Sequence, residues 1–213
     1  MAEMDFFTKC EKADFEKILA NKGYAYFTNG AYNLNIIGVR SNQEKKVTNI
    51  FDDALVLIYY TKQKRILKRH VYRITTEPGT HYMLHPMNEK KGTAILVPGQ
   101  YRSCWEIGKH NGKYKALVQK KAVFVYRDNN KDMTYDLKPE KTEVGVFGIN
   151  IHRSAEFSSS AFVNKFSAGC QVFANPNSFK SFMEFCELQV ANKKGKTFTY
   201  TLLEESDLTI MLK

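Results

Sequence analysis

The sequence lacks long apolar runs and is poor in proline. None of its hydrophobic stretches approaches the roughly 18 residues that a membrane-spanning helix needs, so we expect no membrane interaction. Five prolines and a 43% share of hydrophobic residues exclude a largely disordered chain. A chain of 213 residues can bury a sizeable core, and its length suits one domain or one domain with a small appendage.

Cysteine is also scarce. The four cysteines include no C-x-x-C pair, which is a common zinc-binding spacing. Residues 1–5 are acidic and polar rather than basic and then apolar, so we expect a protein that is synthesised in the cytoplasm without a signal peptide. Synthesis in that reducing compartment argues against disulfides.

Histidine offers one pattern that suits a metal site. His81 and His85 form an H-x3-H pair that, together with His110, would fit a zinc peptidase. Pro78 precedes the pair and Pro86 follows it, which argues against placing both imidazoles on one helical face. We therefore expect no metal, and a metal-dependent peptidase is a minor alternative.

Basic residues outnumber acidic residues. The sequence has 32 lysines and arginines and 22 aspartates and glutamates, and the resulting formal charge of +10 predicts an anionic partner surface. The lysines occur in short groups along the whole chain, such as 45–46, 90–91 and 120–121. Scatter of this kind is typical of a solvated surface, so we expect no nucleic-acid binding.

Most of the chain shows strand patterns between turn residues, as in a β sandwich or barrel. Residues 3–22 have helical periodicity, and residues 176–190 have a second apolar stripe of helical spacing, which begins after Asn175 as a cap. We expect a mainly β fold, a sandwich or barrel-like mixed sheet, with an N-terminal helix and a helix after Cys170. The strand candidates are residues 24–27, 34–40, 55–60, 66–74, 92–97, 105–108, 114–125, 144–151, 171–173 and 198–203.

The polar segment 41–49 has no apolar pattern and predicts a connection. On this interpretation, residues 1–49 form an N-terminal appendage of a helix and a hairpin. Residues 50–213 then form the main domain.

A histidine and a cysteine stand at the ends of two predicted strands. The apolar segment 144–151 ends at His152, and the strand 171–173 begins directly after Cys170. An imidazole within hydrogen-bond reach of a thiol takes its proton, and the thiolate is then the nucleophile. Neighbouring strands can bring the two side chains together, so the pair predicts nucleophilic thiol chemistry.

Two further requirements of that chemistry have candidates nearby. Gly169 has no side chain to block a substrate carbonyl, and backbone N–H groups around it can hold an oxyanion. A third group has to fix the orientation of the imidazole. A backbone carbonyl can do so, and Asn150 and Ser154 are the side-chain candidates.

These motifs resemble those of a known family. His152-Arg153-Ser154, followed by Ser167-Ala168-Gly169-Cys170, is similar to the signature of the L,D-transpeptidases, which pairs a His-Gly-Ser/Thr turn with a Ser-x-Gly-Cys segment. Upstream, residues 74–82 are similar to that family's Thr-Pro-x-Gly-x-Phe/Tyr turn. The matches span roughly residues 50–190. The family usually has glycine after the histidine and arginine after the cysteine, where this chain has Arg153 and Gln171, so its substrate or acceptor can differ.

The resemblance implies an L,D-transpeptidase-like catalytic fold for residues 50–213. In that fold Cys170 is the nucleophile, His152 is its base, Gly169 belongs to the oxyanion site, and no cofactor is needed. Beside the motifs, Arg153 carries a guanidinium that can bind a carboxylate through two hydrogen bonds. The residues that we expect to contact substrate are Arg153, Ser154, Ser167, Gln171, His81 and Tyr82.

The activity implied by the resemblance is acyl transfer on peptidoglycan stem peptides through a thioester on Cys170. Water as the acceptor gives hydrolysis, whereas an amine gives L,D-transpeptidation. Because we expect no signal peptide, we favour a hydrolytic endolysin of a bacteriophage, which degrades the cell wall after release by lysis machinery or transport in a virion. A basic virion or cell-wall-binding protein without chemistry is the alternative. The expected partners are stem peptides and the anionic wall surface.

Overall fold

Eight strands form a closed barrel in the computed structural model, which describes residues 5–41, 46–63 and 65–208. This confirms the predicted mainly β fold with a large mixed sheet. Two neighbouring pairs in the barrel are parallel, β1 with β11 and β9 with β10. In spatial order the barrel strands are β1 (Asn35–Arg40), β11 (Thr197–Glu204), β5 (Gly99–His110), β6 (Tyr114–Gln119), β9 (Ile151–Arg153), β10 (Gln171–Phe173), β3 (Leu67–Thr75) and β2 (Asp53–Tyr60).

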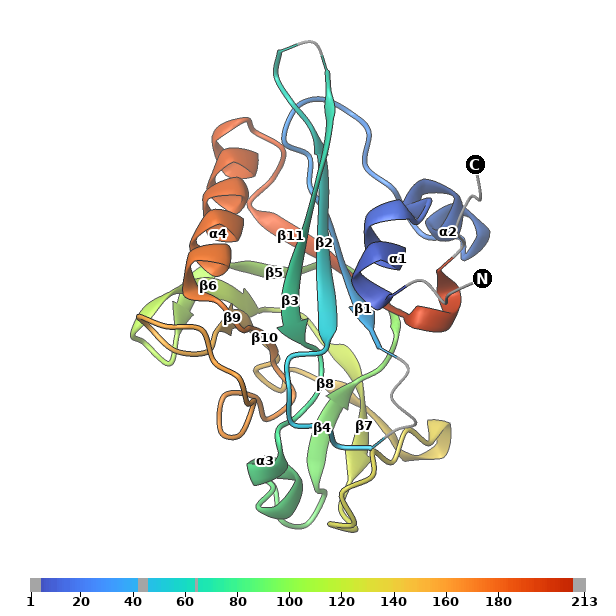
Figure 1. Ribbon diagram of the computed structural model, residues 1–213, viewed down its shortest axis with the longest axis vertical. Coiled ribbons are helices and arrows are strands. Elements are labelled where there is room, and N and C mark those ends of the chain that lie inside the picture. The colour runs from blue at the N-terminus through green and yellow to red at the C-terminus, as the bar shows by residue number, and fades with distance from the viewer. Residues whose placement is uncertain (1–4, 42–45, 64, 209–213) are drawn as a thin grey trace.

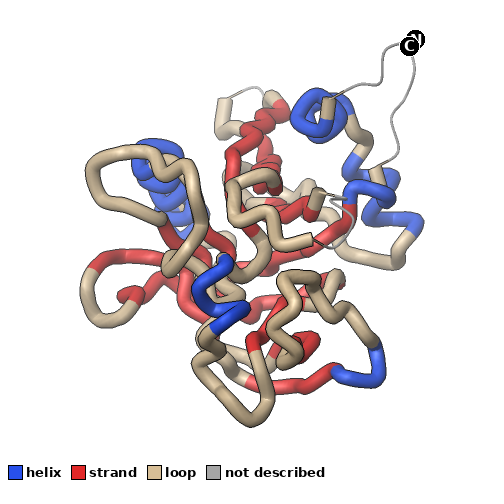
Figure 2. Tube along the Cα trace, turned by 60° about the horizontal axis from the view of Figure 1, so that its bottom comes forward, coloured by secondary structure: helices blue, strands red, loops and turns tan. Residues whose placement is uncertain are grey.

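A smaller sheet and several helices surround the barrel. The smaller sheet has the order β4 (Thr93–Leu96), β7 (Val123–Asp128), β8 (Thr142–Gly145). Figure 1 shows α4 on one side of the barrel and α1 and α2 on the other, with the smaller sheet and α3 at the lower end. Figure 2 brings that lower end forward and shows the long loops that connect its short elements. The helices are α1 (Phe6–Lys12), α2 (Phe15–Asn21), α3 (Thr80–Leu84) and α4 (Pro176–Ala191), and the 3-10 turns are η1 (Pro139–Lys141) and η2 (Glu205–Asp207).

The continuous apolar run of β2 has a simple cause, because both of its faces are covered. Leu55 and Leu57 point into the barrel core, whereas Val56 and Ile58 pack on the outside against a cluster that includes residues of α1 and α2. A strand covered on both faces has no need of alternating polar residues. The N-terminal helices therefore seal one outer face of the barrel.

The predicted helix over residues 3–22 is two helices within its described part. Residues 3 and 4 lie outside the described residues. The break falls at Ala13 and Asp14, where the Asp14 carboxylate accepts a hydrogen bond from the N–H of Lys17 and caps α2. The predicted strand at residues 24–27 is wrong, since this segment is irregular.

The predicted domain boundary after residue 49 is also corrected by the structure. β1 lies before that boundary, yet it pairs with β2 on one side and with β11 on the other. Removing residues 1–49 would therefore open the barrel. The helices and β1 belong to the same folded unit as the residues that follow.

The predicted strand over residues 144–151 is split into β8 and β9. Between them, residues 146–150 are held by side chains of the barrel rather than by a strand ladder. The indole N–H of Trp105 donates to the carbonyl of Ile149 at 2.7 Å. The amide oxygen of Gln119 accepts from the N–H groups of Phe147 and Ile149 at 3.0 and 2.9 Å.

Helix α4 confirms the predicted helix after Cys170. Asn175 caps it by accepting from the N–H of Ser178 at 2.9 Å, and Pro176 occupies the first turn. Its buried apolar residues join the barrel core, and they are Phe179, Phe182, Met183 and Cys186. In the part of the chain that the structure describes, no helix is both long and apolar enough to cross a membrane.

We predict that Gly38→Ala destabilises the barrel. A Cβ at Gly38 would lie 1.8 Å from the hydroxyl oxygen of Tyr200, a fully buried side chain. Overpacking of this kind costs about 1–3 kcal/mol. Urea denaturation should show that loss in the free energy of unfolding. Gly99→Ala is the matched control, since its Cβ would meet nothing closer than 3.9 Å, and equal stabilities of the two variants would contradict the prediction.

Candidate active site

The parallel strands β9 and β10 place Cys170 and His152 on one face of the sheet. Their register pairs Gln171 with Ile151 and Val172 with His152. Side chains alternate along a strand, so His152 shares the face of Val172. Cys170 packs against the same small apolar cluster as Val172. The two residues are thus on neighbouring strands, but the sulfur is bonded to Asn150 and Gly148 and Nε2 of His152 has no partner, so a direct contact between them stays a prediction.

Cys170 is a partly buried thiol that keeps its proton. Its S–H donates to the carbonyl of Gly148 at 3.4 Å, and the N–H of Asn150 donates to the sulfur at 3.4 Å. Burial raises the pKa of the Cys170 thiol to about 11, although the Asn150 N–H acts in the opposite direction. The resting group is thus a neutral thiol rather than a thiolate.

His152 is a neutral imidazole with one nitrogen free. Its Nδ1 lies 2.7 Å from the carbonyl oxygen of Arg153. A carbonyl only accepts, so the proton sits on Nδ1 and the lone pair on Nε2. Nε2 is buried and has no hydrogen-bond partner. Burial, with smaller contributions from His110 and Arg153, lowers the pKa of His152 to about 3.

The group that orients the imidazole is therefore a backbone carbonyl, one of the three candidates from the sequence. The two side-chain candidates have other partners. Asn150 accepts from the N–H of Gln119 at 2.9 Å, and Ser154 donates to the carbonyl of Ala174 at 3.1 Å.

Two further residues, His110 and Tyr114, lie beside His152. His110 was considered only as a metal ligand, yet its ring stacks on that of His152 with centroids 3.9 Å apart. The Tyr114 hydroxyl donates to the carbonyl of Arg153 at 3.1 Å and lies 3.2 Å from Nδ1 of His152. The turn dipeptide Asn111-Gly112 was the available signal, because a hairpin there places residues 110 and 114 opposite each other.

Ser167 and Gly169 shape the turn before Cys170. The Ser167 hydroxyl donates to the carbonyl of Cys170 and accepts from the N–H of Gly169, at 2.8 and 3.1 Å. Gly169 has φ +118°, and a Cβ there would lie 2.2 Å from the carbonyl oxygen of Ala94. The glycine is thus required by a close backbone approach. The N–H of Gly169 already bonds to Ser167, and the oxyanion role of the N–H groups around Gly169 stays a prediction. The fully buried Ser167 offers no surface to a substrate, which corrects the substrate contact predicted for it.

Gln171 and Ser154 are also buried rather than open to substrate. Gln171 is fully buried inside the barrel, where its amide oxygen accepts from the Tyr200 hydroxyl at 2.7 Å. The Ser154 hydroxyl already donates its hydrogen bond to the carbonyl of Ala174. The substrate contacts predicted for these two residues are corrected, since the strand alternation directs Gln171 to the core.

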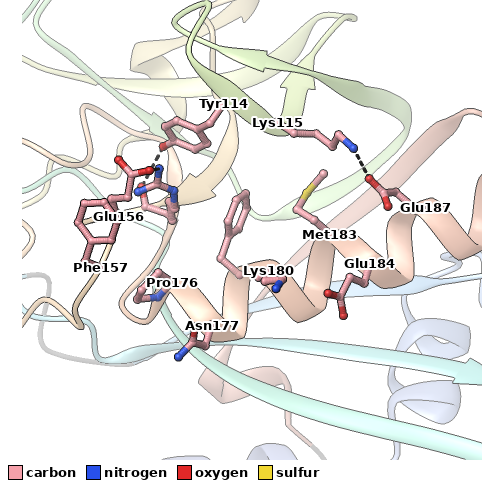
Figure 3. Close-up of a pocket in the computed structure, with 12 residues that line it drawn as sticks. Tyr114, Lys115, Glu156, Phe157, Pro176, Asn177, Lys180, Met183, Glu184 and Glu187 are labelled. Atoms are coloured by element: carbon pink, nitrogen blue, oxygen red, sulfur yellow. Dashed lines mark hydrogen bonds and ion pairs between the residues drawn. The ribbon is translucent and has the colours of Figure 1, made fainter.

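Arg153 faces a cavity of about 480 Å³ between α4 and the strands β6 and β9. Its guanidinium lies over the Tyr114 ring, 4.2 Å from the centroid, and 3.4 Å from the carboxylate of Glu156. Figure 3 shows Tyr114 and Met183 extending toward this cavity from opposite sides. A guanidinium is suited to a carboxylate. The cavity lining combines apolar side chains with further charged ones, among them Tyr114, Phe179, Met183, Lys115, Lys180, Glu156, Glu184 and Glu187.

His81 and Tyr82 lie on α3, in a different part of the surface. His81, together with His85 and the loop at residues 164–166, lines a second cavity of about 550 Å³. The N–H of Gly79 donates to the carbonyl of Ser167 at 3.0 Å, so α3 is tied to the loop that leads to Cys170.

Among the described residues, no three histidines, cysteines or carboxylates gather as a metal-binding group.

We predict that alkylation of Cys170 is slow at neutral pH and accelerates with rising pH. The thiolate is the reactive form, and a pKa of about 11 keeps its fraction small below pH 9. The rate of modification by iodoacetamide should rise about tenfold per pH unit between pH 7 and 10. Peptide mass spectrometry would measure it at Cys170, and a rate that reaches its plateau below pH 7 would contradict the prediction.

The chain was compared with known protein families, curated proteins and solved structures, and none of them matched. The likeness to L,D-transpeptidases therefore rests on the sequence motifs around Pro78, His152 and Cys170. The membership of that family and its particular fold stay predictions.

Proposed function

We propose that the chain is a cysteine peptidase that hydrolyses peptidoglycan stem peptides through a thioester on Cys170. The observation that carries the proposal is the arrangement of β9 and β10. It puts a thiol and an imidazole on one face, and the imidazole has its proton fixed on Nδ1 and its Nε2 lone pair free. A base prepared in this way accepts a thiol proton without changing its tautomer.

Acylation begins with the thiol proton leaving its bond to Gly148 and moving to Nε2 of His152. The sulfur attacks the peptide carbonyl carbon, and the Nδ1–H of the imidazolium stays bound to the carbonyl of Arg153. His152 then gives the proton to the leaving amine as the C–N bond breaks, which leaves a thioester.

Deacylation repeats the proton path in the other direction. His152 takes a proton from water, the hydroxide oxygen attacks the thioester carbonyl, and the C–S bond breaks. The sulfur recovers its proton from the imidazolium, and a carboxylic acid is released. An amine in place of water would give a cross-link by the same steps.

The resting pair is neutral, which sets the timing of proton transfer. With a thiol pKa raised to about 11 and a histidine pKa lowered to about 3, no ion pair forms before substrate binds. Proton transfer must accompany the attack, when the new oxyanion and the imidazolium appear together. The neutral pair also predicts an activity that depends little on pH between about 7 and 9.

Substrate recognition is assigned to the cavity beside Arg153. Stem peptides carry carboxylates, and a guanidinium held on the Tyr114 ring binds such a group with two hydrogen bonds. The formal charge of +10 favours association with an anionic wall. We place the protein at the bacterial cell wall, after release by lysis machinery or transport in a virion.

Muropeptide analysis tests the hydrolysis. Purified peptidoglycan incubated with the protein should give stem peptides that are shorter at their C-terminal end or cleaved at a cross-link, with one water added. Cys170→Ala should abolish this change, and His152→Gln should reduce it at least about 100-fold, since general base catalysis contributes that much. A product pattern that is unchanged, or that is equally altered by Cys170→Ala, would remove the proposal.

A substitution of Arg153 tests the binding role separately. Arg153→Gln keeps the backbone carbonyl that holds His152 and removes only the guanidinium. A hydrogen bond to a charged group contributes about 1.5–3 kcal/mol, so KM should rise about 10-fold or more while kcat changes little. Arg65→Gln is the control, because that guanidinium lies over the Tyr60 ring at 5.8 Å, away from this cavity. Equal KM values for the two variants would contradict the assignment.

A further inference from the structure

The hairpin between β5 and β6 contacts the imidazole of His152 with two side chains. His110 ends β5 and Tyr114 begins β6, and the two residues are paired across the hairpin. The His110 ring lies nearly parallel to that of His152, with an angle of 20° and centroids 3.9 Å apart. Tyr114 binds the carbonyl that fixes Nδ1 of His152. His152 is left only 3% exposed.

The hydrogen bonds of Asn150 fix the protonation of His110. The side-chain oxygen of Asn150 accepts from the N–H of Gln119, so its amide nitrogen must be the group 3.1 Å from Nδ1 of His110. An amide nitrogen only donates, and Nδ1 of His110 therefore accepts. The proton of His110 then sits on Nε2, so the exposed amide of Asn111, whose nitrogen lies 3.1 Å away, has to turn its oxygen toward this N–H to accept it.

We propose that His110 is a positioning residue for the base His152. Its neutral ring covers one face of the imidazole, prevents rotation away from the Arg153 carbonyl, and keeps Nε2 free. The inference rests on the proposed function insofar as His152 acts as a base. The stack and the tautomers are properties of the chain without substrate.

The neutrality of His110 matters when His152 takes a proton. An uncharged aromatic ring stacks favourably on the imidazolium that forms during attack. A protonated His110 would put a second positive charge beside that imidazolium and would break the bond to Asn150. Burial lowers the pKa of His110 and so favours the neutral form.

Protonation of His110 at acid pH should therefore reduce the ability of His152 to accept a proton. The titratable or charged groups that face this stack are His152 on β9, Tyr114 on β6, Arg153 beside it and the Cys170 thiol across the strand pair. Of these, the His152 pKa is lowered to about 3 and the Tyr114 and Cys170 pKa values are raised. His110 is thus the group in this set that takes a proton first as the pH falls below neutral.

Nitrogen NMR of the histidine side chains tests the proposal without substrate. In the wild type, His152 should show a single tautomer with the proton on Nδ1 and should not titrate between pH 5 and 8. His110→Ala should let the two nitrogen signals of His152 average and should move its pKa upward toward 6.5, because water reaches the ring. His110→Phe keeps an aromatic ring in the stack and should keep the wild-type signals.

His85→Ala serves as the matched control, since His85 follows the last residue of α3 and stacks on His81 with centroids 4.9 Å apart. It should leave the signals of His152 unchanged. A single Nδ1–H tautomer and an unshifted pKa of His152 in His110→Ala would overturn the proposal. So would an averaged signal in folded His110→Phe, because the retained stack would then not be what fixes the ring.

Kinetics with peptidoglycan separates this inference from the proposed function. His110→Ala should lower kcat about 10–100-fold with little change in KM, the cost of a misplaced catalytic group. His110→Phe should stay within a few fold of the wild type and lose the decline in rate at acid pH. If the wild type has no activity while the NMR signals behave as expected, the proposed function fails and the positioning role stands. If activity is present and His110→Ala retains the full kcat, the positioning role fails.

Discussion

The parallel register between β9 and β10 is the constraint on which the site depends. The two strands have three residues each, and their pairing sets Val172 beside His152 and Gln171 beside Ile151. A slip by one residue would turn the imidazole to the core and Ile151 to the outside. The imidazole would then lose its contact with the ring of His110. The hydrogen bond from Trp105 to the carbonyl of Ile149 helps to hold this register.

Buried polar groups inside the barrel stabilise that register, because they hold Gln171 on the core side of β10. Gln171 accepts from the Tyr200 hydroxyl and donates to the carbonyl of Thr76 at 3.4 Å, and the guanidinium of Arg40 donates to the same carbonyl at 3.2 Å. Arg40 is 3% exposed and forms an ion pair with Glu77 at 3.1 Å. Buried polar groups of this kind are costly when one partner is lost, so they fix the arrangement of the strands that carry them. The residue after Cys170 is therefore a structural anchor of its strand.

Motif and periodicity allowed much of the fold to be predicted, and particular residues show why the rest was not. The helix α4, the strand β10 and the placement of His152 and Cys170 on neighbouring strands follow from local patterns. The burial of Gln171 and Ser167 could not be predicted in this way. A sequence pattern does not show whether the partner of a polar residue is a substrate or a buried group of the protein. His110 stacks on His152, and a local pattern cannot show that two residues 42 positions apart in the sequence meet in the fold.

The sequence by itself determined a mainly β chain, a capped helix after Cys170, and a thiol and an imidazole on two neighbouring segments with strand patterns. Only the tertiary structure decided that β1 completes the barrel, that Gly169 is needed for a close backbone approach, and that the Arg153 carbonyl fixes the imidazole. The physical reason is that the alternation and spacing of apolar residues indicate which side chains are buried. The hydrogen-bond partner of a buried group is chosen by strands that the chain brings together only on closing the barrel.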